Sequence, residues 1–154
     1  MASTRDSQRQ KVYNAERDAL QPISIRWPEV GQMQHYVNKI VRSRWFKSRW
    51  PHLVSISVGD GRSRRRGAGQ YYGGGCGEIK MPVWTRYEYY ILHEVAHVIQ
   101  GYQYPRSIMH GPEFCSIYLA LVSRWMGKWY GATLRGAFRR YHVKWRLNGK
   151  AAKS

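Results

Sequence analysis

Apolar residues in the first half of the chain recur first at helical spacing and then at strand spacing. In the stretch 26–46 they fall every three or four positions, which predicts an amphipathic helix that begins at Pro28. The segment 52–59 (HLVSISVG) alternates apolar and polar residues and predicts a half-buried strand. A second strand is expected over 77–83 (GEIKMPV), where Pro82 favours an edge position or the end of the strand. The glycine- and arginine-rich stretch 59–77 shows no period, so we expect a long, flexible connection there.

The remaining patterns are helical. A short helix is expected near 12–20, before Pro22. Thr85 and Glu88 have the spacing of a capping box, which predicts a helix from about residue 86 to the position before Gly101. Two further helices are expected over 112–126 and 131–145. The sequence thus predicts a single α+β domain with a small antiparallel or mixed sheet, spanning 11–147, between a flexible N-terminus, 1–10, and a flexible basic tail, 148–154.

The charge is strongly unbalanced. The 154 residues include 26 lysines and arginines against 9 aspartates and glutamates, a formal charge of +17. Such a field attracts polyanions and predicts nonspecific, electrostatic binding of nucleic acid. The candidate contacts are Arg62, Arg64, Arg65 and Arg66 in the glycine-rich connection, and Arg139 and Arg140 in the last helix. A solvated charge run explains the first group equally well, and an ordinary surface helix, or one on an anionic membrane surface, explains the second.

The same sequence limits the setting of the protein. No apolar run reaches the roughly 18 residues of a membrane span, and the stretch MASTRDSQRQ lacks the apolar core of a secretory signal, so we expect a cytoplasmic protein. Cys76 and Cys115 are the only cysteines, which excludes a disulfide framework or a four-cysteine zinc ribbon within one chain. Both are expected to be reduced packing residues.

The chemistry of the chain is concentrated in the stretch YYILHEVAHVIQ, residues 89–100. In a helix, His93 and His97 project from the same face and can give two imidazole nitrogens to one metal ion. Glu94 can approach the open side of that ion as the general base for a bound water. Zinc is the favoured metal, although imidazole also accepts iron, nickel and copper. The alternative is a buried helix whose histidines only form hydrogen bonds, which is costly without a common partner.

A catalytic zinc site needs a third protein ligand. The metzincin pattern requires a glycine and a histidine where this chain has Gln100 and Gln103, so that pattern does not apply. His110 and Glu113 in the stretch MHGPEF are the downstream candidates. We prefer His110, because a carboxylate in the first turn of a helix is already favoured by the helix dipole.

With these residues in view, the chain resembles the SprT-like zinc metallopeptidases, in particular a compact group of metallohydrolases from actinobacteria and their phages. The matching segments are GEIKMPVWTRYEYYILHEVAHVI and HGPEFCSIYLALVSRWMG. The resemblance implies a zincin-like domain with an edge strand beside the active-site helix, zinc bound by His93, His97 and His110, Glu94 as the base, and a link to DNA. A phage-encoded relative would act in the host cytoplasm. The chain departs from SprT and Spartan in lacking a C-terminal zinc ribbon.

These observations predict a zinc-dependent metallopeptidase that hydrolyses proteins near nucleic acid. An extended peptide substrate could pair with an exposed edge of the 77–83 strand. Two alternatives stay open. One is a nucleic-acid-binding protein with a structural zinc site closed by a fourth ligand such as Glu113 or Cys76, and the other is a hydrolase of a nonpeptide amide. The sequence selects neither an oxyanion-stabilising residue nor an oligomeric state.

Overall fold

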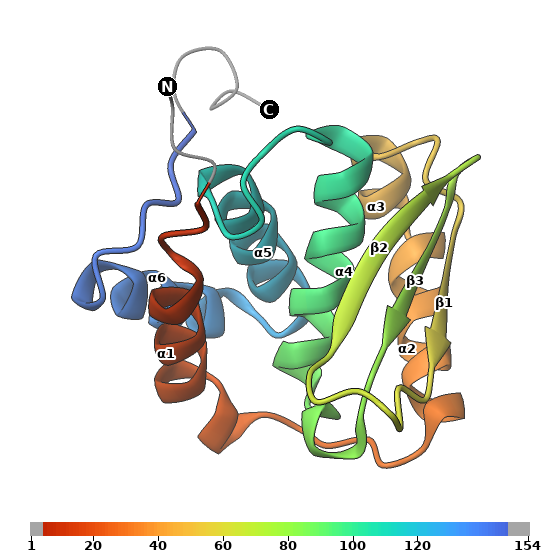
Figure 1. Ribbon diagram of the computed structural model, residues 1–154, viewed down its shortest axis with the longest axis horizontal. Coiled ribbons are helices and arrows are strands. Elements are labelled where there is room, and N and C mark those ends of the chain that lie inside the picture. The colour runs from red at the N-terminus through yellow and green to blue at the C-terminus, as the bar shows by residue number, and fades with distance from the viewer. Residues whose placement is uncertain (1–4, 148–154) are drawn as a thin grey trace. The chain divides into compact units, whose positions relative to one another are not determined.

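The computed structural model describes residues 5–147, which form two compact units. One unit is the continuous stretch Ser24–Pro105, and the other combines residues 5–23 with residues 106–147. In the described residues the elements are six α-helices and one three-stranded mixed sheet, which confirms the α+β class (Figure 1). The expected tail, 148–154, and the first four residues of the expected flexible N-terminus lie outside the described residues.

The unit 24–105 contains the sheet and three α-helices. The helices are α2 (Val30–Arg42), α3 (Arg44–Arg49) and α4 (Glu88–Gln103), and a short 3-10 turn, η2 (Val83–Thr85), precedes α4. The strands are β1 (Ser55–Gly59), β2 (Ala68–Gly73) and β3 (Cys76–Lys80). They lie in the order β1-β3-β2, with β1 parallel and β2 antiparallel to β3.

Two expectations about this sheet were wrong. The glycine-rich stretch 59–77 is not one long flexible connection, because it contains β2 and the tight turn that joins β2 to β3. Gly73, Gly74 and Gly75 all have positive φ angles in this turn, a conformation that favours glycine. The strand predicted over 77–83 is not an edge strand, because β3 is hydrogen-bonded on both sides and ends before Pro82.

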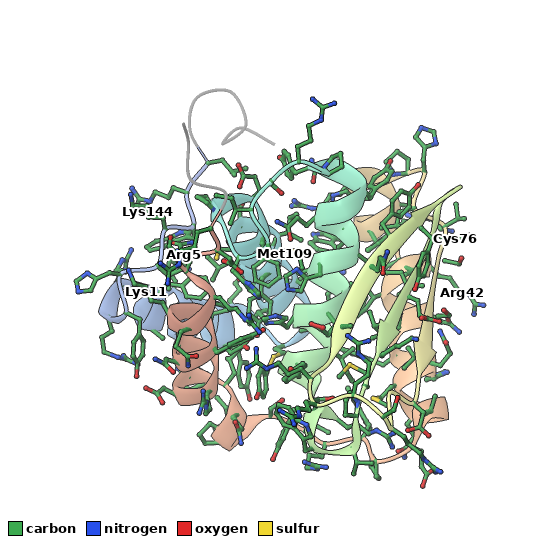
Figure 2. All side chains as sticks on the ribbon, in the orientation of Figure 1. Arg5, Lys11, Arg42, Cys76, Met109 and Lys144 are labelled. Atoms are coloured by element: carbon green, nitrogen blue, oxygen red, sulfur yellow. The ribbon has the colours of Figure 1, made fainter. Side chains whose placement is uncertain are left out.

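One face of the sheet is covered and the other is open to solvent. Ile56, Gly77 and Ile79 point to the same face and are buried, whereas their neighbours alternate as half-buried or exposed residues. Helix α4 contacts β2 and β3, and α2 contacts β1, so these helices supply the cover. Cys76, labelled in Figure 2, begins β3 and is exposed.

Glycines let the sheet approach α4 closely. A Cβ atom at Gly69 in β2 would lie 2.1 Å from the carbonyl oxygen of Glu94, and one at Gly77 in β3 would lie 2.3 Å from Cγ1 of Val98. No side chain fits at these distances. Figure 1 shows α4 running alongside β2 as a result.

The N-terminus of α4 is set by tertiary contacts and not by the predicted capping box. The N-cap is Tyr87, and the Thr85 hydroxyl donates instead to the carbonyl of Pro82. Glu88 accepts a hydrogen bond of 2.7 Å from the Tyr36 hydroxyl on α2. Burial raises the pKa of the Glu88 carboxyl, and burial together with the Glu88 charge keeps the pKa of Tyr36 well above its usual range. The pair thus ties the first turn of α4 to α2.

The second unit is helical in its described part. It contains α1 (Arg9–Ala19), the 3-10 turn η1 (Gln21–Ile23), α5 (Pro112–Trp125) and α6 (Lys128–Arg140). Helix α6 contacts both α1 and α5, and the core includes Val12, Phe114, Tyr118 and Phe138. No helix within residues 5–147 has the length and apolar character needed to cross a membrane.

Replacing Gly69 with alanine is expected to lower the free energy of unfolding by about 1–3 kcal/mol or more, because the new methyl group would press on the backbone of α4. The matched control is Gly31→Ala in α2, where a Cβ meets nothing within 4 Å and stability should stay unchanged or rise by up to about 1 kcal/mol. Urea unfolding monitored by circular dichroism measures both. Equal stabilities for the two variants would contradict the close approach of β2 and α4.

Candidate metal centre

Helix α4 carries polar side chains in a wholly buried stretch. Every residue from Glu88 to Gln100 is buried, and most are apolar or aromatic. His93, Glu94 and His97 are exposed by only 1%, 3% and 7%. Removing such groups from water is unfavourable unless internal partners replace the water. The stretch therefore requires specific contacts for these three side chains.

His93 and His97 lie one above the other on α4, as their spacing predicts. Their ring centroids are 4.9 Å apart. Nδ1 of His97 is 3.1 Å from Oε1 of Gln100, one turn further along the helix. An amide oxygen accepts a hydrogen bond, so this contact assigns the N–H to Nδ1 of His97 and leaves Nε2 as the nitrogen able to bind a metal.

His110 lies just before α5, and its neighbour Gly111 is the N-cap of that helix. The His110 side chain is 4% exposed, and its Nδ1 is 2.6 Å from Oδ2 of Asp6. Its carbonyl accepts a hydrogen bond of 2.9 Å from Nε2 of Gln8. Both the ring and the backbone of His110 are therefore held by residues that immediately precede α1.

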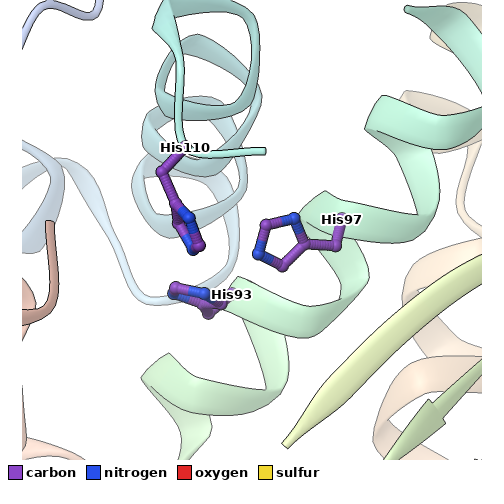
Figure 3. A group of neighbouring side chains, drawn as sticks. All are labelled: His93, His97 and His110. Atoms are coloured by element: carbon purple, nitrogen blue, oxygen red, sulfur yellow. The ribbon is translucent and has the colours of Figure 1, made fainter. Parts of the chain in front are cut away.

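The three histidines are positioned to hold a metal ion. Each offers one ring nitrogen, and the three nitrogens lie within 4.8 Å of one another. Figure 3 draws His93, His97 and His110 as one neighbouring group. In the described residues this group has three members and does not include Glu113, Cys76 or Cys115, so the choice of His110 over Glu113 agrees with the structure.

Glu94 lies beside the first of these ligands. Its Oε1 is 3.8 Å from Nε2 of His93. A Cβ atom at Gly67, just before β2, would lie 3.3 Å from the carboxyl carbon of Glu94 and 2.6 Å from the ring of Tyr90. The N–H of Gly67 donates to the Tyr90 hydroxyl at 3.3 Å, and the Tyr90 ring centroid is 5.7 Å from that of His93. The backbone at Gly67 thus passes close to the Glu94 carboxyl group.

The candidate nucleic-acid residues are all exposed. Arg62, Arg64, Arg65 and Arg66 occupy the loop between β1 and β2, and Arg139 and Arg140 end α6. The loop is anchored, because Nε1 of Trp84 donates to the Arg65 carbonyl at 2.7 Å. Arg62 forms an ion pair of 2.9 Å with Asp60, so its charge is partly compensated. The two groups belong to different units of the chain.

The two thiols differ in environment. Cys76 is exposed, so the expectation that it is a packing residue was wrong. Cys115 is buried, and its Sγ donates to the His110 carbonyl at 3.6 Å. Burial raises the pKa of the Cys115 thiol well above its usual value, and the nearby carboxylates of Glu16, Asp6 and Glu113 raise it further. Cys115 therefore stays protonated and packs as a small apolar residue, as the sequence predicts.

Two polar partners of the histidines are not predicted from the sequence. Gln100 stands out there only as a mismatch to the metzincin pattern, although its place three residues after His97 is a signal for contact within one helical turn. Asp6 gives no usable signal, because it precedes the first helical pattern and lies 104 residues before His110.

Comparisons with protein-family models, with curated proteins and with solved structures gave no match for this chain. Its function is therefore inferred from the residues and their geometry.

The purified protein is expected to bind about one divalent metal ion per chain, and zinc more tightly than magnesium or calcium, because its donors are imidazole nitrogens. Replacing His110 with alanine removes a proposed ligand. Zinc affinity should therefore fall by more than the roughly 100-fold seen when a residue that only forms a hydrogen bond to a ligand is lost. His35→Ala is the control, since His35 is exposed on α2. Elemental analysis and competition with a chromogenic chelator measure both. Unchanged affinity after the His110 substitution would remove this residue from the site.

Proposed function

We propose that the protein is a zinc-dependent metallopeptidase of the SprT-like, zincin type. The observation that carries this proposal is the group of three buried histidines whose ring nitrogens lie within 4.8 Å of one another, with a glutamate directly after the first. Three protein ligands leave one tetrahedral position open, which is typical of catalytic and not of structural zinc. This feature favours an enzyme over a nucleic-acid-binding protein with a closed zinc site.

The donor set fits zinc. Nδ1 of His97 and of His110 each face an oxygen, from Gln100 and Asp6, so both rings present Nε2 as the ligand atom. Bound zinc would acidify a water molecule and polarise a substrate carbonyl. Neutral imidazole ligands preserve the charge of the ion, which keeps this acidifying effect strong.

Glu94 has the position of a general base. Its carboxylate lies one residue along α4 from His93, close to the ligand nitrogens without belonging to the three-histidine group. We assign to it the transfer of a proton from the attacking water to the leaving amine. The backbone at Gly67, held by the Tyr90 hydroxyl, passes close to this carboxyl group and limits the orientations it can adopt, which suits a group that must accept a proton at a fixed place.

The substrate we propose is an extended segment of a protein. Strand β2 ends the sheet order and lies against α4 at Glu94, so it replaces β3 as the strand on which such a segment could form backbone hydrogen bonds. A β-strand ligand brings its own amide carbonyls to the edge in register, which favours a peptide over a small nonpeptide amide.

Nucleic acid is the second partner we propose, bound electrostatically and without base recognition. The formal charge of +17 and the exposed arginines of the loop 60–67 support this proposal. Because this loop leads into β2 beside Glu94, protein segments attached to the bound polyanion would be concentrated near the carboxylate.

Replacing Glu94 with glutamine is expected to lower turnover of an unfolded protein substrate by about 10²–10⁴-fold, because an amide cannot accept the proton. Zinc content should stay near that of the wild type. Glu78→Gln in β3 is the control, since Glu78 lies on the solvent face of the sheet. Cleavage is followed by gel electrophoresis and mass spectrometry, with small amide substrates in parallel. Retained proteolysis in the Glu94 variant would exclude its role as base.

The double substitution Arg64→Gln and Arg65→Gln is expected to reduce the salt dependence of DNA binding. The slope of log K against log salt should become smaller by up to about 0.9 for each phosphate that the protein no longer neutralises. The control is Lys11→Gln with Arg17→Gln on α1, which removes the same charge from exposed positions. Fluorescence anisotropy at several salt concentrations measures the slopes. Equal changes for the two pairs would show that only net charge matters.

A further inference from the structure

Asp6 lies where it can fix the third histidine of the metal centre. Its Oδ2 is 2.6 Å from Nδ1 of His110, and both side chains are largely withdrawn from solvent. The carboxylate oxygen is the acceptor in this contact, so the N–H belongs to Nδ1 of His110. The contact therefore selects the tautomer that carries hydrogen on Nδ1, and it points Nε2 away from Asp6.

The side chain of Gln8 anchors the segment that contains Asp6 through hydrogen bonds. Nε2 of Gln8 donates to the carbonyl of His110 at 2.9 Å and to that of Lys144 at 3.1 Å, while its Oε1 accepts the N–H of Lys144 at 2.6 Å. The side chain of one glutamine thus joins three stretches of the same unit: the segment before α1, the residue before Gly111 and the segment after α6. Asp6 is held two residues away from this junction.

We propose that Asp6 is a positioning residue for the metal centre, held in place by Gln8, which keeps His110 in the tautomer and orientation that bind zinc. The inference rests on the proposed metal binding. A carboxylate on the outer nitrogen also makes the inner nitrogen a stronger donor, so Asp6 acts on affinity through His110 and does not touch the ion. Asp6 and Gln8 thereby contribute to the metal centre, although neither is a ligand.

The contact explains why a short polar segment before the first helix adopts a defined path. Orienting a histidine costs rotamer entropy, and a partner that holds the ring before metal arrives removes that cost from the binding step. The ring of Tyr13 on α1, with its centroid 5.3 Å from that of His110, adds a second restraint from the same region.

The test compares Asp6→Ala, Asp6→Asn and Asp6→Glu with Asp18→Asn in the full-length protein. Asp18 is the matched control, because it is an aspartate of the same unit whose carboxylate accepts from the Tyr141 hydroxyl and not from a histidine. Zinc affinity, measured by chelator competition, should fall about 10–100-fold for Asp6→Ala and less for Asp6→Asn, which keeps an acceptor oxygen. Asp6→Glu should recover part of the loss, and Asp18→Asn should match the wild type.

A second readout does not depend on metal. Nitrogen-15 NMR of the metal-free protein reports the tautomer of His110, which should be the Nδ1–H form in the wild type and in Asp18→Asn, and a mixture in Asp6→Ala. If the wild type binds no zinc, the metallopeptidase proposal fails, while the tautomer measurement still decides whether Asp6 fixes the ring of His110. Wild-type affinity and an unchanged tautomer in Asp6→Ala would overturn the inference. Should Asp6→Ala unfold, the same two measurements on Asp6→Asn decide it.

Discussion

The burial of three polar side chains within helix α4 is the constraint on which the unit 24–105 depends. The helix satisfies its own backbone hydrogen bonds, but the side chains of His93, Glu94 and His97 lose water and need partners that the helical ladder does not supply. Gln100 supplies one partner for His97, and a shared metal ion would satisfy both rings at once. An apolar helix in the same place would tolerate many exchanges of similar volume. Helix α4 instead requires partner atoms at hydrogen-bonding or metal-binding distance from its buried polar side chains. The residues around it must therefore meet this geometry as well as fill the space.

Glycine residues allow the sheet to approach α4 closely, and they are also the residues whose role was wrongly predicted from the sequence. In the stretch 59–77 the glycines suggest flexibility, whereas in the fold Gly69 provides room for the α4 backbone and the glycines from Gly73 to Gly75 form the turn into β3. A missing Cβ has both effects, freedom of the chain and space for a neighbour. The sequence cannot distinguish them, because the neighbour that uses the space is contributed by a segment some 25 residues further along the chain.

What the sequence predicted well was local in origin. The helical period of 26–46 and of 112–126, and the strand alternation of 52–59, depend only on neighbours within a few residues. The last two correspond to α5 and β1, whereas the single helix expected over 26–46 is divided at Ser43 into α2 and α3. The relation of His93 to His97 follows from one turn of helix. The Thr85 capping box failed because η2 places that hydroxyl on the carbonyl of Pro82. His110 can be found through its donor chemistry, but Asp6 cannot, because no local pattern records a contact across 104 residues.

The arginine-rich loop passes next to Glu94 in one short stretch of backbone. Trp84 holds the Arg65 carbonyl and Tyr90 holds the Gly67 N–H, next to Glu94. Exposed arginine charges are screened over about 8 Å at physiological salt, so a polyanion on this loop would act mainly by raising the local concentration of attached substrate.

To change the rate of the proposed chemical step as well, the bound polyanion would have to favour one of two loop arrangements with different contacts to Glu94. Two independent backbone anchors oppose such a rearrangement. In the peptidase that we propose, the charge is therefore expected to govern recruitment of the substrate and α4 the chemical step, so that salt should affect KM far more than kcat.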